Sequence, residues 1–292
     1  MTGAGATATR ISRRTLVSAG VAAAALGAAV EGAQAQESRS TRKRLRQSVS
    51  RWCYGSMSLD DLCVAAKAIG LVGIDLLGES EWETVHRHGL TCTMATAIGS
   101  IPDGWNRVEN HDSLVRTAEQ LIPALAKAGL PNVVTFSGNR RGMSDAVGLD
   151  NCVKGLKRIA PLAEQHRVTV CLELLNSKRS HKDYQADHTA WGVELCKRVG
   201  SEQIKLLYDV FHMQIMEGDL CDTIRENIRW IGHVHTGGVP GRADIDGTQE
   251  INYPRVCKAL VDAGYSGYVA HEFVPRRDPL TALREAYRIC DV

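Results

Sequence analysis

Two short runs of sequence, Thr169-Val170-Cys171-Leu172-Glu173 and Lys205-Leu206-Leu207-Tyr208-Asp209, share one design. Each is mostly apolar, is too short for a typical helix and ends in a carboxylate, as does the run at residues 267–272. Residues 232–236 form another short run, which has histidines at positions 233 and 235. Longer amphipathic stretches separate these runs. Short buried runs that alternate with helix-length stretches are typical of β/α units around a parallel sheet.

Four more candidate strands lie upstream, at residues 47–53, 72–76, 91–95 and 132–136. Between the runs, residues 114–128 and 152–166 carry apolar side chains at three- and four-residue spacing, which predicts helices packed on a sheet. Eight strands in a chain of this length predict one α/β domain. We expect a single (β/α)8 TIM barrel over residues 47–292.

The composition excludes several classes of protein. Of the 292 residues, 44% are apolar and 23% are charged, which is too balanced for a disordered or collagen-like chain. The 35 basic residues nearly match the 33 acidic ones, and a net charge of +2 argues against a nucleic-acid partner. No strongly apolar run reaches the roughly 18 residues of a membrane span, so we expect no stable membrane insertion after signal removal.

The first residues predict an export signal. Arg13-Arg14 precedes an Ala/Gly-rich run at residues 16–30, and Ala33-Gln34-Ala35 is a site suited to a signal peptidase. This order predicts a twin-arginine signal peptide over residues 1–35 and a flexible lead-in over residues 36–46. The mature protein is then periplasmic or extracellular. The alternative is an amphipathic or disordered tail with a chance arginine pair.

All nine cysteines lie after this segment. They are Cys53, Cys63, Cys92, Cys152, Cys171, Cys196, Cys221, Cys257 and Cys290. Their number is odd, none are in C-x-x-C spacing, and several lie within apolar runs. We therefore expect mostly buried, free thiols instead of a disulfide framework.

Four potential metal ligands end four successive predicted strands: Glu173, Asp209, His235 and Glu272. In a parallel barrel the carboxyl ends of the strands form one rim, where catalytic residues gather. Three carboxylates buried there repel one another unless a cation offsets their charge. Any one of the four is more simply a polar strand end, but together they predict a site for a hard divalent metal ion.

Strand alternation distinguishes the histidines near this site. His233 and His235 are two residues apart, so both face the same side of their strand. His235 lies nearer the rim and is the better ligand, whereas His233 is expected one layer deeper, as a supporting donor or a core histidine. His271 precedes Glu272 and is expected to face outward toward a helix in a structural role.

Five motifs follow one another along the chain: ELLN at 173–176, YDVFHMQ at 208–214, GVPGR at 238–242, EINY at 250–253 and GYVAHEF at 267–273. Together they resemble the hydroxypyruvate isomerase family, which belongs to the xylose-isomerase-like barrels. The similarity extends over residues 47–275, essentially the whole predicted barrel.

The resemblance implies a (β/α)8 barrel, a Mg²⁺ or Mn²⁺ ion, and interconversion of hydroxypyruvate with tartronate semialdehyde. The two essential glutamates of the family correspond to Glu173 and Glu272, and its metal-binding aspartate to Asp209. His235 departs from the glutamine of the best-known bacterial isomerases, and ketose 3-epimerases and xylose isomerases carry histidine there. The export signal and the loop at residues 243–249 are further departures from the family.

Moving a carbonyl group to the adjacent carbon requires a positioned base and a cation near the oxygens. We expect Glu173 and Glu272 to act as the acid/base pair and also to contact the metal. His212 follows Asp209 closely enough to reach a substrate, and Arg242 can bind a carboxylate with two parallel hydrogen bonds. Asn176 can orient Glu173 or donate to the substrate, so His212, Arg242 and Asn176 are candidate substrate-binding residues.

For each of several other positions at the rim, the sequence is consistent with two roles. The polar loop at residues 137–142, with Arg140 and Arg141, can bind an anion or form a solvated turn. Trp52 and Tyr54 can line the pocket or pack in the core. Glu250 can close over the site or pair with a surface arginine.

Three other functions use a similar barrel. A ketose 3-epimerase needs the same metal and both glutamates, with room for a longer sugar. A phosphodiesterase of the endonuclease IV type would need more histidines at the rim and a basic surface for DNA, and the sequence has neither. A non-catalytic exported sugar-binding protein would gain little from two buried glutamates. The favoured partner is a small hydroxy-keto acid or sugar, and the sequence leaves a homo-oligomer open.

Overall fold

The computed structural model describes residues 1–3 and 45–292 of the chain. The predicted signal peptide, apart from its first three residues, and nearly all of the predicted lead-in at residues 36–46 lie outside the described residues. The folded unit that contains the predicted site comprises residues 44–292.

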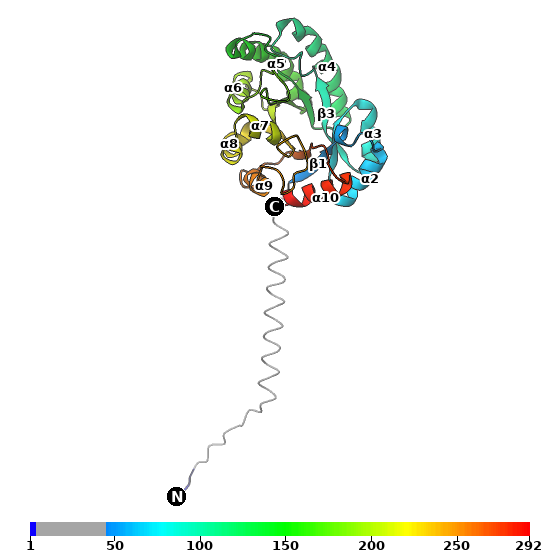
Figure 1. Cartoon of the computed structure of the whole chain (residues 1–292), viewed down its shortest axis with the longest axis vertical. Helices are drawn as coiled ribbons and strands as arrows, with labels where there is room; N and C mark the ends of the chain where they lie inside the picture. The colour runs from blue at the N-terminus through cyan, green and yellow to red at the C-terminus, as the bar shows by residue number, and fades with distance from the viewer. Residues whose placement is uncertain (4–44) are drawn as a thin grey trace. The chain divides into compact units, whose positions relative to one another are not determined.

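Eight parallel strands form a closed barrel in the order in which they occur along the chain (Figure 1). The strands are β1 (Arg46–Ser50), β2 (Gly73–Leu77), β3 (Thr91–Ile98), β4 (Asn132–Thr135), β5 (Thr169–Glu173), β6 (Ile204–Asp209), β7 (Ile231–Thr236) and β8 (Tyr268–His271). β1 pairs with β8 through Gln47 and Val269, which closes the barrel. The predicted (β/α)8 TIM barrel is therefore confirmed.

Helices surround the barrel and connect its strands (Figure 1). The α-helices are α2 (Leu59–Ile69), α3 (Glu79–Arg87), α4 (His111–Lys127), α5 (Asp145–His166), α6 (Thr189–Val199), α7 (Val210–Met216), α8 (Leu220–Asn227), α9 (Tyr253–Asp262) and α10 (Pro279–Cys290). Three short 3-10 helices are η1 (Arg51–Tyr54), η2 (Val108–Asn110) and η3 (Ile228–Trp230).

The structure corrects several predicted boundaries. The first strand was expected to reach residue 53, but it ends at Ser50, and the chain turns into η1 at the barrel rim. The helices predicted to begin at residues 114 and 152 begin earlier, at His111 and Asp145. The first turn of α4 is mostly polar and that of α5 is mostly exposed, so neither shows the apolar periodicity of a packed helix.

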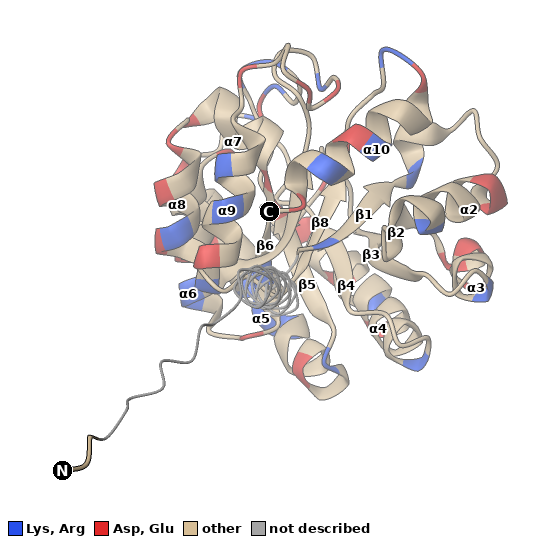
Figure 2. Cartoon of the chain, turned by 90° about the horizontal axis from the view of Figure 1, so that it is seen from below, with Lys and Arg blue, Asp and Glu red and all other residues tan. Residues whose placement is uncertain are grey.

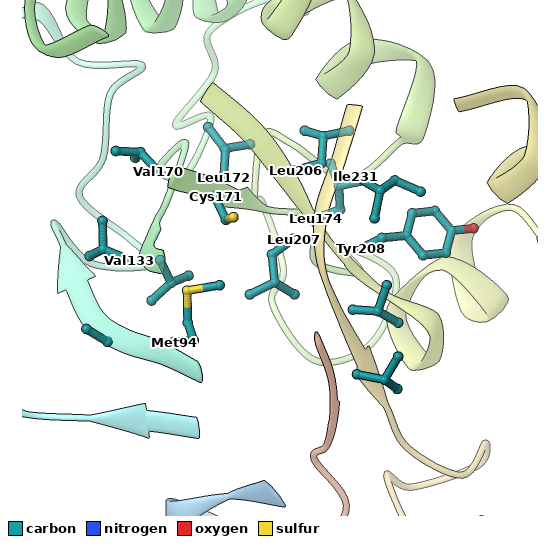
Figure 3. Close-up of a cluster of buried hydrophobic side chains, with 14 of the residues drawn as sticks. Met94, Val133, Val170, Cys171, Leu172, Leu174, Leu206, Leu207, Tyr208 and Ile231 are labelled. Atoms are coloured by element: carbon teal, nitrogen blue, oxygen red, sulfur yellow. The ribbon is translucent and has the colours of Figure 1, made fainter. Parts of the chain in front are cut away.

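Alternation along the strands builds two apolar layers (Figure 3). Cys171 and Leu207 lie two residues before Glu173 and Asp209, so they point to the barrel interior with those carboxylates. Leu206 points the other way and packs on α6, where a Cβ added at Gly192 would meet its side chain at 2.8 Å. All nine cysteines are free and seven are buried, as expected for small core residues.

Basic and acidic residues are both distributed over the outer helices (Figure 2). Within the described part of the chain, no helix combines the length and the apolar character needed to cross a bilayer.

Candidate metal centre and active site

The four predicted metal ligands converge at the carboxyl end of the barrel. One ligand atom from each of Glu173, Asp209, His235 and Glu272 lies within 4.8 Å of those from the other three, and all four residues are buried. Glu173 and Asp209 are the last residues of β5 and β6, and Glu272 directly follows β8. The parallel strands thus bring together side chains that lie far apart in the sequence.

Asp209 is oriented by the helix that it begins. Its Oδ1 accepts hydrogen bonds from the backbone N–H groups of Phe211 (2.9 Å) and His212 (3.3 Å), so Asp209 is the N-cap of α7. Its other oxygen, Oδ2, lies 3.9 Å from Nδ1 of His235. Oδ1 of Asp209 therefore caps the helix, and Oδ2 faces the other candidate metal ligands.

His235 is held by a carboxylate that the sequence analysis missed. Its Nε2 lies 2.8 Å from Oδ2 of Asp75 on β2, across the barrel interior. Although burial raises the pKa of Asp75, the neighbouring His233 and His235 lower it to about 2, so Asp75 is ionised and Nε2 of His235 donates. A carboxylate in this position is the usual partner of a metal-binding histidine. An aspartate within the buried strand Gly73–Leu77 was the signal that could have revealed it.

The second ring nitrogen of His235 faces the other ligands. Nδ1 lies 2.6 Å from Oε2 of Glu272, 3.6 Å from Oε1 of Glu173 and 3.9 Å from Oδ2 of Asp209. Despite these distances, Nδ1 has no partner with hydrogen-bond geometry among the described residues. A nitrogen so placed, together with three carboxylates, fits a divalent cation.

Electrostatics favour a cation at the same point. Burial, reinforced by repulsion from Glu272 and Asp209, raises the pKa of Glu173 above its ordinary value, although His235 opposes the shift. For Glu272 burial acts in the same direction, but Arg242 and His235 outweigh it and lower the pKa. Four buried carboxylates, including Asp75, face the guanidinium of Arg242 and the imidazoles of His233 and His235. A divalent ion offsets the remaining negative charge.

Arg242 lies among the predicted ligands. Its Nη2 is 2.5 Å from Oδ2 of Asp209 and also donates to Oε2 of Glu272. Its guanidinium stacks on Phe211, 4.9 Å from the ring centroid. Arg242 thus borders the cavity as predicted, and its binding of a substrate carboxylate stays a prediction.

His212 and Asn176 form a second layer on this side. Oδ1 of Asn176 accepts from the backbone N–H groups of Arg179 and Ser180, which directs Nδ2 toward Nδ1 of His212, 2.5 Å away. Burial lowers the pKa of His212 to about 3, so its ring is neutral. His212 lines the cavity, whereas Asn176 is fully buried behind it. Asn176 therefore orients His212, not Glu173, and would reach a ligand only through it.

The site opens into a cavity of about 470 Å³. On the side of β5–β8 and β1 it is lined by Trp52, Glu173, Leu175, Ser180, His181, Phe211, His212, Gly241, Arg242 and Glu272, and on the side of β2–β4 by Leu76, Thr96, Ala97, Ile101, Val134 and Phe136. Its volume falls within the roughly 300–1,000 Å³ of small-molecule sites.

Trp52 stands at the edge of this cavity. Trp52 is 51% exposed, yet its Nε1 donates to Oε1 of Glu272 at 2.6 Å. Trp52 therefore lines the pocket, whereas Tyr54, which was given the same two readings, is buried in the core.

The remaining candidates lie outside the cavity lining. Arg140 pairs with Asp187 and Asp145, and Arg141 pairs with Asp103, so acidic neighbours compensate the charges of this loop. Glu250 is exposed.

The histidines follow the predicted alternation. His233 is buried one layer below His235, with Nε2 3.2 Å from Oδ1 of Asp75. His271 faces outward and contacts Gln47, whose side chain donates to the backbone of Tyr287 on α10.

A family model described as "Xylose isomerase-like TIM barrel" matches residues 79–290. The chain belongs to this family. The match extends from the start of α3 to the end of α10 and includes all four residues of the candidate metal centre.

Three relatives of this xylose isomerase-like barrel have names that bear on function. A human protein provisionally named hydroxypyruvate isomerase is 34% identical over 170 residues, which are 56% of this chain and 61% of the human one. Hydroxypyruvate isomerase of Escherichia coli (strain K12) is 31% identical over 135 residues, covering 45% and 50%. D-psicose 3-epimerase of Ruminiclostridium cellulolyticum is 33% identical over 127 residues, covering 42% and 40%. Each match spans less than two thirds of the relative's length.

Proposed function

We propose that this protein is a metal-dependent aldose–ketose isomerase that interconverts hydroxypyruvate and tartronate semialdehyde. The observation that carries the proposal is the pair of buried glutamates, Glu173 and Glu272, which line the cavity and share a ligand cluster with Asp209 and His235. The hydroxypyruvate isomerase relatives support the same reaction.

Glu173, Asp209, His235 and Glu272 would hold the ion. A bound divalent ion supplies positive charge for the oxygens of an enediolate. One glutamate removes a proton from the hydroxyl-bearing carbon, and a proton is returned to the former carbonyl carbon. Trp52 holds Glu272 by its hydrogen bond, and Arg242, which lines the cavity, would bind the substrate carboxylate.

A ketose 3-epimerase is the alternative. His235, the D-psicose 3-epimerase relative and a cavity larger than a three-carbon acid requires all favour it. Epimerisation also needs a proton removed and returned next to a carbonyl, so the same two glutamates would serve. Substrate size separates the two functions.

The test uses purified protein with Mn²⁺, hydroxypyruvate and, in parallel, D-fructose or D-psicose in D2O. We expect tartronate semialdehyde, deuterium at carbon and loss of both with a chelator. Glu173→Gln and Glu272→Gln should each lower kcat by about 10²–10⁴-fold. Glu250→Gln, an exposed glutamate outside the cavity, is the matched control and should retain activity. Epimerised ketose without turnover of hydroxypyruvate would favour the alternative, and a ligand bound without any exchange would indicate a binding protein.

We also propose that the protein is exported by the twin-arginine route. Arg13-Arg14, the Ala/Gly-rich run and Ala33-Gln34-Ala35 support this proposal. Cell fractionation with an antibody should find a shortened protein outside the cytoplasm. Changing both arginines to lysine should retain the full-length protein inside, and an unchanged distribution would contradict export by this route.

A further inference from the structure

The cavity has two chemically different walls. The carboxylates, imidazoles and guanidinium all come from β5–β8 and the loops that follow them. On the opposite side, β2, β3, β4 and the loop after β3 contribute Leu76, Ala97, Ile101, Val134 and Phe136, with Thr96 as the polar lining residue. A substrate anchored at the metal centre therefore directs its far end toward apolar side chains.

Leu76 lines the cavity because its backbone departs from regular strand geometry. Leu76 has φ +57°, in the left-handed region that glycine and asparagine occupy more readily. The register of β2 with β3 shifts on both sides of Asp75, which identifies a bulge. Regular alternation after the inward-facing Asp75 would turn Leu76 toward the helices. The bulge instead places Leu76 in the cavity lining, so a strained position exposes an apolar side chain to the ligand.

The size of the cavity also indicates a substrate that extends to the apolar wall. Hydroxypyruvate has no atoms beyond its hydroxymethyl group, its carbonyl and its carboxylate, all of which the polar wall would engage. A cavity of about 470 Å³ is larger than such a molecule, and Leu76, Ile101 and Phe136 line part of the remaining space. Water there would face side chains that offer it few hydrogen bonds.

We propose that the preferred substrate carries an apolar substituent, as in a 3-hydroxy-2-oxo acid with an alkyl or aryl group on C3. This inference rests on the proposed isomerase function and names its substrate class. The reaction removes the proton from C3 and returns one to C2. The carbonyl moves from C2 to C3, and a hydroxyl proton moves between the two oxygens, so no external oxidant or reductant is needed. Hydroxypyruvate is the member of this class with hydrogen in place of the substituent.

A matched pair of probes tests the inference. 3-Hydroxy-2-oxopentanoate and 3,4-dihydroxy-2-oxobutanoate have the same size and differ by a terminal methyl against a hydroxyl. With the Mn²⁺-loaded protein we expect kcat/KM to be about tenfold to a hundredfold higher for the methyl compound, as in other apolar pockets. A ratio of one or less would overturn the inference, whereas turnover of hydroxypyruvate in the same assay would leave the proposed function intact.

Substitutions in the apolar wall test whether its side chains cause the preference for the methyl compound. Leu76→Asn suits the left-handed backbone but presents a polar side chain, so it should fold and lower the ratio by about tenfold. Ile101→Asn on the following loop should act in the same direction. Val64→Asn is the matched control because Val64 is 59% exposed on α2, outside the cavity lining, and should leave the ratio unchanged. Folded Leu76→Asn and Ile101→Asn variants that both keep the wild-type ratio would contradict the assignment.

A binding measurement separates this inference from failure of the proposed reaction. 2-Hydroxypentanoate and 2,4-dihydroxybutanoate form the same methyl/hydroxyl pair without a carbonyl to isomerise. Calorimetry with the Mn²⁺-loaded protein should give tighter binding of 2-hydroxypentanoate, and Leu76→Asn should reduce the difference. Tighter binding without turnover of any probe would refute the isomerase while supporting the apolar substituent. Equal binding of both acids would count against the inference whatever the reaction.

Discussion

Replacing Asp75 by asparagine removes the charge behind His235 while keeping the shape of the side chain. In the wild type, Oδ2 of Asp75 accepts from Nε2 of His235 at 2.8 Å, and Oδ1 accepts from Thr93 at 2.5 Å. The asparagine oxygen can still accept from His235, and its amide can donate to the hydroxyl of Thr93. We therefore expect Asp75→Asn to fold and to leave a less strongly held, less basic imidazole at the metal centre.

The expected loss is in metal affinity. Changing the partner of a metal-binding histidine typically weakens binding about 10–100-fold, or roughly 1.4–2.8 kcal/mol. Asp75 should fall in this range because it is fully buried and His235 is its direct partner. The effect should be smaller than loss of His235 itself, since the ligand nitrogen Nδ1 is retained.

The assay is calorimetric titration of the protein with Mn²⁺, together with thermal unfolding in a chelator. Asp187→Asn is the matched control, because Asp187 is another buried aspartate whose partners are Arg140, Ser177 and His188. It should change stability and leave Mn²⁺ affinity near wild type. Wild-type affinity in a folded Asp75→Asn protein, or an equal loss in both variants, would refute the reasoning.

Three more predictions concern the same centre. Metal titrations at several pH values should show an affinity that falls with decreasing pH. Burial lowers the pKa of His235, but Glu272 and the other carboxylates raise it well above its ordinary value, so a proton competes with the metal for Nδ1 until the pH exceeds that raised pKa. A metal affinity that is constant with pH would contradict this competition. Trp52→Phe should lower kcat/KM about fivefold, roughly 1 kcal/mol, because Glu272 loses a hydrogen bond at a partly exposed position; steady-state kinetics with wild-type values would show that the bond does not matter. Arg242→Gln should raise Mn²⁺ affinity, because the guanidinium binds carboxylate oxygens of Asp209 and Glu272 that a cation would also use. The same change should lower the Tm in a chelator, since breaking a buried ion pair costs about 3–5 kcal/mol. If Mn²⁺ raised the Tm of the variant less than that of the wild type, competition between Arg242 and Mn²⁺ for these carboxylates would be contradicted.

The sequence predicted those parts of the site that depend on local pattern. Glu173 and Asp209 end apolar runs, and parallel strands bring such ends together without any knowledge of side-chain contacts. The spacing of His233 and His235 likewise separated a deeper histidine from a rim histidine. Each of these inferences uses the period of a strand, which a single sequence displays.

Contacts across the barrel could not be predicted in this way. Asp75 lies on β2 and its partner His235 on β7, strands that do not pair with one another. Only the closed barrel brings the two side chains together in its interior. The η1 turn that lets Trp52 reach Glu272 was also missed, because residues 51–54 contain no glycine, proline or asparagine that would mark the end of the strand.

The bulge in β2 connects the two walls of the cavity. Asp75 faces the barrel interior and supports His235, and the next residue, Leu76, lines the apolar wall. In a regular strand adjacent residues face opposite sides of the sheet, so Asp75 and Leu76 could not both face the inside of the barrel. The left-handed conformation of Leu76 removes this restriction. A substitution that straightened the strand would therefore displace the carboxylate behind His235 together with the apolar contact, and metal affinity and substrate preference should change together.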